Sequence, residues 1–253
     1  MKILKKSIIG CLLLAGMTMS SCDFLDVVPK ENATGEDMTK DRQAALNYLY
    51  SCYGYLPQPN NGTSSLDLLT GDEVVTAFEH ETFAAFPKGN YTASSPVISY
   101  WNTLYQGIRQ CLSFEEELNK GGNFSGLEDK NRTDYKAQVK FLLGYYDFLL
   151  TRCYGPIILV TTKPDAKTNP ENYLPRTSYD VCVDSIVNYF DQAAKGLPAT
   201  RTGTQSSEFG LATSVAAKAM KAKTLLYAAS PLFNGNSKFY ANFKGKVAKV
   251  CTA

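Results

Sequence analysis

Histidine and tryptophan are almost absent from this sequence, with one residue of each among 253. Most general-base, nucleophile-activating and zinc sites use imidazole, so a single His80 argues against many classes of enzyme. An excess of charge of one sign is also missing. The 26 lysines and arginines face 24 aspartates and glutamates, and three of the lysines lie in residues 1–21, which contain no acid. The remainder therefore has no basic excess of the kind that recruits nucleic acid or anionic lipid.

Long apolar runs are missing after residue 22. The most apolar later stretch, 141–160, is interrupted by Asp147, Arg152 and Pro156, whereas a membrane-spanning helix needs about 20 mostly apolar residues. Heptad and Gly-X-Y periods are absent, which excludes a coiled coil or a collagen-like chain. What the chain does contain is 44% hydrophobic and 12% aromatic residues. This composition is typical of a globular fold with a sizeable core.

The seven cysteines form no CxxC pair and no cluster with histidine, so we predict no metal site and no thiol redox motif. Setting aside Cys11 and Cys22 near the N-terminus leaves an odd number, which argues against a disulfide framework and leaves a single pair open. Four of the remaining five fall in or at the end of predicted helices, where a buried thiol acts as a small apolar group: Cys52, Cys111, Cys153 and Cys182.

The first 22 residues have the pattern of an export signal. Residues 1–6 are cationic, residues 8–17 are mostly apolar and too short to span a bilayer, and Ser20-Ser21-Cys22 follows. Small residues directly before a cysteine indicate a bacterial lipoprotein signal, in which the thiol is acylated and becomes the new N-terminus. We therefore predict a signal peptide over 1–21, a lipidated Cys22 and an extended tether over 22–38. The alternative is an ordinary secretory signal that leaves Cys22 a free thiol.

Apolar residues at three- and four-residue spacing predict an all-α domain over 39–236. The segment 58–96 between the first two helices is too rich in Gly, Pro, Asn and Ser for one regular element, so we expect a long irregular loop there. The last four helix starts are about 35 to 43 residues apart, a spacing that suits antiparallel helix pairs of tetratricopeptide-like type. The predicted starts are Thr39 or Asp41, Ser99, Asp134, Thr177 or Ser178, and Thr213.

Two finer expectations concern packing. Gly144 lies inside an otherwise apolar helix, where glycine is unfavourable, so we expect it to permit a close helix crossing. In the last helix we expect the apolar side to face inward, with the lysines Lys218, Lys221 and Lys223 toward solvent. The residues expected inward are Val215, Ala219, Ala222, Leu226 and Ala229.

Three stretches in order carry a family resemblance. The first is Cys22 followed by Leu25-Asp26-Val-Val-Pro29. The second is an aromatic-rich helix that closes on Tyr154-Gly155-Pro156-Ile-Ile-Leu-Val. The third runs from Arg176-Thr177-Ser178 through Leu197-Pro198 and Gly210-Leu-Ala212 to Tyr227-Ala-Ala-Ser-Pro-Leu-Phe233. Together they resemble the SusD/RagB family of nutrient-binding outer-membrane lipoproteins.

The resemblance implies a cell-surface lipoprotein of helical repeats, anchored in the outer membrane through a lipid such as palmitate. It would capture a glycan or another nutrient and deliver it to a SusC-like TonB-dependent transporter. It implies neither catalysis nor a cofactor. This agrees with the residues, which contain no Gly-x-Ser-x-Gly, no His-Glu-x-x-His and no phosphate-binding glycine loop.

The sequence departs from the family in its C-terminal part. Members are substantially longer, and the atypical tail, 237–253, does not continue the family pattern. A premature stop, a frameshift or a truncated gene would account for both features. We then expect the later helices to keep an uncovered apolar face and the isolated chain to be poorly stable.

A glycan site needs aromatic rings for the C–H faces of sugars and polar groups for their hydroxyls. The candidate residues lie in the long loop and at the start of the second helix, where packing against the core is the competing role for the aromatics: Asp72, Phe83, Phe86, Tyr91 and Trp101. Three other functional readings stay open. They are a helical-repeat adaptor that binds a protein, a non-functional fragment, and an enzyme that uses acids such as Glu115 with Glu117 or Asp72 with Glu73.

Overall fold

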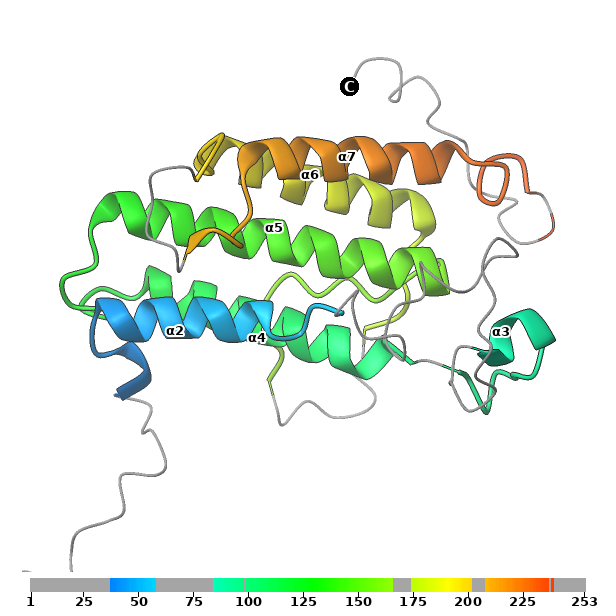
Figure 1. Ribbon diagram of the computed structural model, residues 1–253, viewed down its shortest axis with the longest axis horizontal. Helices are drawn as coiled ribbons and strands as arrows, with labels where there is room; N and C mark the ends of the chain where they lie inside the picture. Colours follow the sequence, from blue (N-terminus) through cyan, green and yellow to red (C-terminus); the bar gives the residue numbers. More distant parts are fainter. Residues whose placement is uncertain are drawn as a thin grey trace, which may run out of the picture. The chain divides into compact units, whose positions relative to one another are not determined.

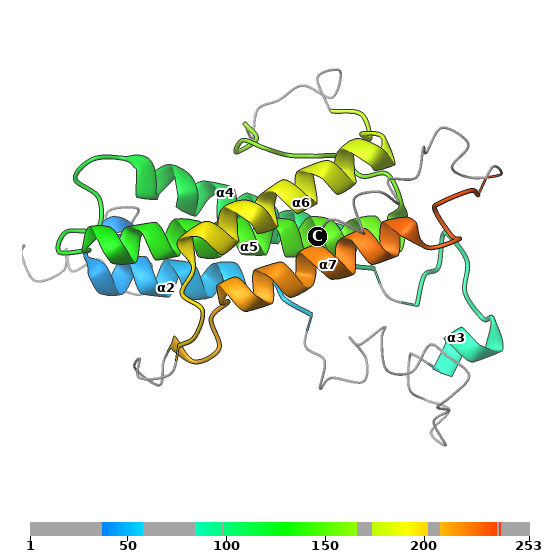
Figure 2. The same cartoon turned by 90° about the horizontal axis from the view of Figure 1, so that it is seen from above.

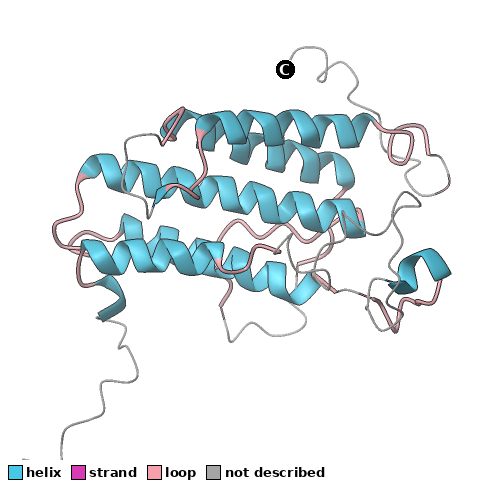
Figure 3. Cartoon of the chain, in the orientation of Figure 1, coloured by secondary structure: helices cyan, strands magenta, loops and turns pink. Residues whose placement is uncertain are grey.

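The computed structural model describes residues 37–57, 84–97, 99–165, 174–201, 208–236 and 238. Every regular element within these ranges is a helix (Figure 3), so the predicted all-α class is confirmed. The elements are η1 (Asp37–Thr39), α2 (Arg42–Tyr53), α3 (Ala85–Lys88), α4 (Trp101–Asn119), α5 (Asp129–Tyr154), α6 (Tyr179–Gly196) and α7 (Ser214–Ala229).

The five long helices pack as successive antiparallel neighbours. α2 contacts α4, α4 contacts α5, α5 contacts α6, and α6 contacts α7. Figure 1 shows α2 and α4 in one layer, α5 in the middle and α6 with α7 in the layer beyond it. Figure 2 looks down on this stack from above, where α6 crosses over α5. This stacking of helix pairs is the tetratricopeptide-like arrangement that the spacing predicted.

Local sequence accounts for where the helices begin and end. The side chain of Asp41 accepts a hydrogen bond from the Ala44 N–H at 2.9 Å and caps α2. Thr213 caps α7 in the same way, and α5 ends at Gly155, which has a φ of 69°. α5 begins at Asp129 rather than at the predicted Asp134. Its first turn is polar and mostly exposed, so it contributes nothing to the apolar period.

α5 is the central helix of the core. It is buried on nearly every side, as its apolar sequence predicted. The expected close crossing at Gly144 is also confirmed, because a Cβ there would lie 3.1 Å from Cε1 of Phe190 on α6. Three of the four helical cysteines, Cys52, Cys111 and Cys182, are buried, but Cys153 is exposed.

The predicted inward side of α7 was wrong, although Lys218 and Lys223, two of the three lysines expected toward solvent, are exposed. Val215 and Leu226 are 60% and 65% exposed, and Ala219 and Ala222 between them are exposed as well. The opposite side packs inward, through Ala217, Thr224, Leu225 and Ala228. Apolar residues surround almost the whole of α7, so their period does not select one face. An ion pair does distinguish the faces, because Lys221 lies 2.9 Å from Asp191 on α6.

None of the helices in the described ranges is both long and apolar enough to cross a bilayer. The predicted signal peptide, the lipidated Cys22 and nearly all of the predicted tether and tail lie outside the described residues.

Candidate functional site

An open groove of about 390 Å³ runs along α4 beside the extended segment that follows α5. This volume lies within the range of ligand-binding clefts, roughly 300–1,000 Å³. α4 contributes two neighbouring rows of side chains, one aromatic and one polar, and the segment after α5 contributes two aliphatic residues. The lining residues are Trp101, Tyr105, Asn102, Gln106, Arg109, Ile158 and Val160.

Trp101 is the aromatic centre of this groove, and its ring is held by neighbours. The Arg176 guanidinium carbon lies 4.8 Å from the ring centroid, an attractive cation–π geometry. The same guanidinium donates hydrogen bonds to the carbonyls of Tyr154 and Pro156. Tyr154 meets the Trp101 ring edge-on at 5.2 Å, and Tyr105 lies 5.0 Å away. Trp101 is therefore partly buried, and it combines packing with a place on the groove surface.

Tyr105, on α4, holds the segment after α5 that forms the other wall of the groove. Its hydroxyl donates to the Ile158 carbonyl and accepts from the Ile158 N–H, each at 2.9 Å. Burial is the main cause that raises the pKa of Tyr105 to about 12. The phenol is thus neutral and able to keep both hydrogen bonds across the physiological pH range.

The polar row consists of exposed side chains on one side of α4. Asn102, Gln106 and Arg109 follow one another at helical spacing and are all exposed. One guanidinium nitrogen of Arg109 donates to the Pro164 carbonyl at 3.0 Å, which orients the side chain. Two amides and a guanidinium beside two aromatic rings can hydrogen-bond hydroxyls and pack against an apolar ligand face.

A second aromatic surface lies on the segment 84–97. The Phe86 and Tyr91 rings pack at 5.2 Å between centroids, and Tyr91 is 50% exposed. The backbones of Thr92 and Ser95 exchange hydrogen bonds in the turn that follows. Gly89 closes the short helix α3 with a φ of 67°, a conformation that favours glycine.

The structure separates the predicted site residues. Asp72 and Phe83 lie outside the described residues. Phe86 and Tyr91 pair with each other, whereas Trp101 belongs to the α4 groove, whose described lining includes neither of them. Sequence reasoning missed the polar row of α4. The sequence did contain a signal for this row: its residues are spaced by four and then three positions, beside Trp101.

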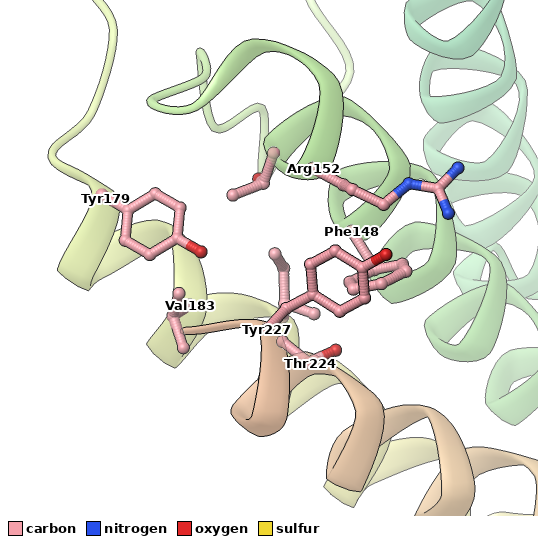
Figure 4. A pocket seen from close by; sticks show the side chains of 8 residues that line it. Phe148, Arg152, Tyr179, Val183, Thr224 and Tyr227 are labelled. Atoms are coloured by element: carbon pink, nitrogen blue, oxygen red, sulfur yellow. The ribbon is translucent and has the colours of Figure 1, made fainter. Parts of the chain in front are cut away.

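A much smaller cavity lies between α5, α6 and α7 (Figure 4). Its volume of about 10 Å³ is close to the minimum that holds one water molecule. Phe148, Tyr179 and Tyr227 point toward it, as Figure 4 shows, and Thr151 also lines it. The cavity is too small for a sugar, so the α4 groove is the better ligand site.

The described residues contain no cluster of three or more His, Cys, Asp or Glu that could hold a metal ion. Asp147 is the most perturbed carboxyl among them, because burial alone raises its pKa to about 8. It is 2% exposed within the core and is not part of the groove lining.

Comparison with known proteins assigns the family. The family model described as "SusD-like: starch-binding associating with outer membrane" matches residues 23–226. The chain belongs to the SusD-like family. This range includes α2, α4, α5 and α6, α7 as far as Leu226, and the whole lining of the α4 groove. No curated protein sequence matches the chain.

Solved structures of SusD-like proteins share the fold. A protein named BT4246 is 35% identical with a TM-score of 0.64, over 79% of this chain and 33% of BT4246. A laminarin-binding SusD-like protein is 18% identical with a TM-score of 0.62, over 75% of this chain and 41% of that protein. Surface glycan-binding protein A from Bacteroides uniformis is 18% identical with a TM-score of 0.56, over 80% of this chain and 50% of that protein. The last two show the fold alone, and the chain spans a third to a half of the length of all three.

Proposed function

We propose that this SusD-like chain captures an oligosaccharide at the outer membrane by stacking and hydrogen bonding, without chemical change. The match to the family model over residues 23–226 carries this proposal, because that family is described as starch-binding. The printed names of two structural neighbours, which mention laminarin and surface glycans, point to the same class of ligand.

The α4 groove suits such a ligand. Pyranose rings present C–H faces that pack on aromatic side chains, and Trp101 and Tyr105 form the aromatic row. The hydroxyls need donors and acceptors, which the Asn102 and Gln106 amides supply, while Arg109 adds a charged donor. The exposed Tyr91 ring, backed by Phe86, is a second contact for a chain of several sugars.

Anchoring and delivery complete the proposed role. An acylated Cys22 would hold the chain at the outer membrane, since each buried CH₂ contributes about 0.8 kcal/mol and stable attachment takes more than one signal or acyl chain. The cargo would then pass to a SusC-like TonB-dependent transporter. Surface display of the lipoprotein is part of this proposal.

Glycan retention tests the proposed site. Native gels containing starch, laminarin or other polysaccharides should slow the migration of the chain in at least one case. The double substitution Gln106→Ala with Arg109→Ala should reduce retention about tenfold or more, because it removes two polar contacts. Phe86→Ala with Tyr91→Ala should weaken it as well.

The matched control is Gln43→Ala, which removes an exposed amide from α2. Retention equal to that of the unsubstituted chain is expected for this control. Equal retention in the groove variant would remove the α4 groove from the proposal. Failure to retain any polysaccharide would contradict glycan capture and would favour the protein-binding adaptor.

Anchoring is tested separately by metabolic labelling with palmitate in a bacterial host. The chain should take up label and enter the detergent phase of a partition, and Cys22→Ser should abolish both. An unlabelled chain in the aqueous phase would contradict the lipid anchor while leaving glycan binding to its own test.

A further inference from the structure

Two of the buried cysteines, Cys52 on α2 and Cys111 on α4, have no part in the proposed glycan site. Both are 0% exposed, and neither lines the α4 groove. They are free thiols in the structure, and a buried free thiol ordinarily packs as a small apolar group. A side-chain hydrogen bond joins these two, however. Their sulfur atoms are therefore direct neighbours, which is more than apolar packing requires.

The packing of α2 on α4 explains why the two thiols meet. Tyr48 on α2 stacks on Phe114 on α4, with ring centroids 4.8 Å apart. The Gln110 amide on α4 donates to the Ser51 hydroxyl on α2 at 2.8 Å. A later residue of α2 thus meets an earlier residue of α4, as antiparallel helices require. The two cysteines lie one turn onward from Tyr48 and one turn back from Phe114, so this register places them opposite each other.

The backbones also come close together in this region. A Cβ on Gly107 would lie 2.9 Å from Cβ of Tyr55, just after α2, and Gly107 is one turn from Cys111 on α4. A disulfide needs Cβ atoms about 3.5–4.5 Å apart and Cα atoms about 4.4–6.8 Å apart. The close approach one turn away favours that spacing. The Tyr146 hydroxyl donates to the Cys52 carbonyl and so holds the end of α2 in place.

The other two cysteines among the described residues are engaged or placed elsewhere. Cys153 is exposed near the end of α5. The Cys182 thiol, on α6, donates to the carbonyls of Ile157 at 3.9 Å and Thr177 at 3.4 Å. Among the described residues, the cysteines of α2 and α4 are therefore the two that face each other.

The compartment decides whether facing thiols stay reduced. The family is described as associating with the outer membrane, and a chain that reaches this membrane folds outside the cytoplasm. Thiols there meet disulfide-carrying oxidants, whereas cytoplasmic thiols are kept reduced. The inference rests on this location, which is part of the proposed function, and does not depend on glycan capture.

We propose that Cys52 and Cys111 join in a disulfide when the chain folds after export, which fastens α2 to α4. The oxidant is a disulfide of a protein or small molecule in that compartment. One cysteine thiolate attacks this disulfide, forms a mixed disulfide and releases the first thiol of the oxidant. The second cysteine attacks the mixed disulfide, the Sγ–Sγ bond forms, and the second thiol leaves. Two cysteine thiols are oxidised, one disulfide is reduced, and the two protons pass to the released thiols.

Burial determines when this bond forms. It raises the pKa of the Cys111 thiol well above its ordinary value, so the reactive thiolate is scarce in the folded chain. A bulky oxidant also has no access to a residue that is 0% exposed. The exchange therefore precedes the full packing of α2 on α4, and the finished bond is shielded from reductants. It closes a loop over residues 53–110, which carries the aromatic pair Phe86 and Tyr91.

Peptide mapping of the purified full chain tests the pairing. The chain is unfolded in urea with reductant, refolded with oxidised and reduced glutathione, unfolded again, alkylated and cut with trypsin. Trypsin places the two cysteines on separate peptides, 43–88 and 110–120. We expect these peptides to be linked, at the sum of their masses less two hydrogens. Separate alkylated or glutathionylated peptides, or a link to another cysteine, would overturn the proposal.

The same map is made of the chain in the membrane fraction of an exporting bacterium, alkylated before any reduction. The linked peptide should be present there too, and its absence would overturn the formation of the bond after export. Glycan retention is scored separately on the same preparation. A chain that carries the link but retains no polysaccharide would contradict glycan capture alone.

Variants separate the bond from packing. Cys153→Ser, which removes an exposed thiol, is the matched control for Cys111→Ala. In the control the linked peptide should persist, and refolding with dithiothreitol in place of glutathione should lower the midpoint of thermal unfolding by about 5 °C or more. In Cys111→Ala this shift should vanish, whatever the stability of the variant itself. An equal shift in both variants, or a shift in neither, would contradict a bond that fastens α2 to α4.

Discussion

The hydroxyl of Tyr105 satisfies both backbone groups of Ile158, donating to its carbonyl and accepting from its N–H at 2.9 Å each. This contact joins α4 to the extended segment after α5, two parts of the chain that are 53 residues apart in sequence. One side chain thereby satisfies two backbone groups of a segment that forms no strand among the described residues. Both residues line the α4 groove.

Tyr105→Phe should weaken the attachment of the Ile158 segment to α4. The substitution keeps the ring but leaves two backbone groups of Ile158 without their partner, so the free energy of unfolding should fall by about 1–3 kcal/mol. Urea unfolding followed by circular dichroism measures the change. Tyr91→Phe, at a half-exposed ring, is the control and should be neutral. Equal stability of the two variants would contradict the structural role of Tyr105.

Gly107→Ala should destabilise the junction of α2, α4 and α5. A Cβ at Gly107 would lie 2.9 Å from Cε2 of Tyr146 and 2.9 Å from Cβ of Tyr55. Tyr146 is fully buried and its hydroxyl donates to the Cys52 carbonyl, so it has little freedom to move. The cost of overpacking, about 1–3 kcal/mol, exceeds the gain of about 1 kcal/mol in helix propensity.

Thermal and urea unfolding of the Gly107→Ala variant measure that loss. Gly121→Ala is the matched control, because nothing lies within 4 Å of a Cβ at that position. A Gly107 variant as stable as the Gly121 variant would show that α4 and α5 pack less closely than described.

Asp147 should make stability depend on pH in an unusual direction. Burial raises its pKa to about 8, whereas an aspartate in the unfolded chain titrates near 3.9. Between these values the folded state binds more protons than the unfolded state, so the free energy of unfolding falls as pH rises from about 4 to 8. Tyr105, Cys111, Cys182 and Tyr189 are the titratable groups whose own pKa values its charge raises.

Asp147→Asn should remove that part of the pH dependence. Urea unfolding at pH 5 and pH 8 should show a smaller loss of stability for the variant than for the unsubstituted chain. Asp129→Asn, at an exposed position on the same helix, should leave the slope unchanged. A slope that persists in the Asp147 variant would mean that other groups cause it.

The helices were predictable because their apolar periods and terminating residues agree. Asp41, one of two predicted starts of the first helix, and Thr213, the predicted start of the last, cap their helices in the structure, and Gly144 lies at the close crossing that its position predicted. The orientation of α7 was not predictable. Apolar residues occur on both of its sides, and the Lys221–Asp191 ion pair that distinguishes them joins two different helices.

The candidate site was only partly predictable. Trp101 was identified as an aromatic residue at the start of a helix, but its neighbours Arg176 and Tyr154 are distant in sequence and meet it only through the fold. The polar row of α4 resembles an ordinary solvated helix side, and only the segment that carries Ile158 and Val160 turns it into a groove. Asp72 and Phe83 lie outside the described residues, and their role stays a prediction.

Titration of the chain with oligosaccharides, followed by tryptophan emission, tests the central claim most directly. Trp101 is the single tryptophan of the sequence and lines the α4 groove, so its emission reports on that groove alone. Maltose-type and laminarin-type oligosaccharides should be compared. We predict a saturable change with at least one of them, lost in the Gln106→Ala and Arg109→Ala variant and kept in Gln43→Ala. Emission that stays constant with every oligosaccharide would contradict glycan capture in this groove.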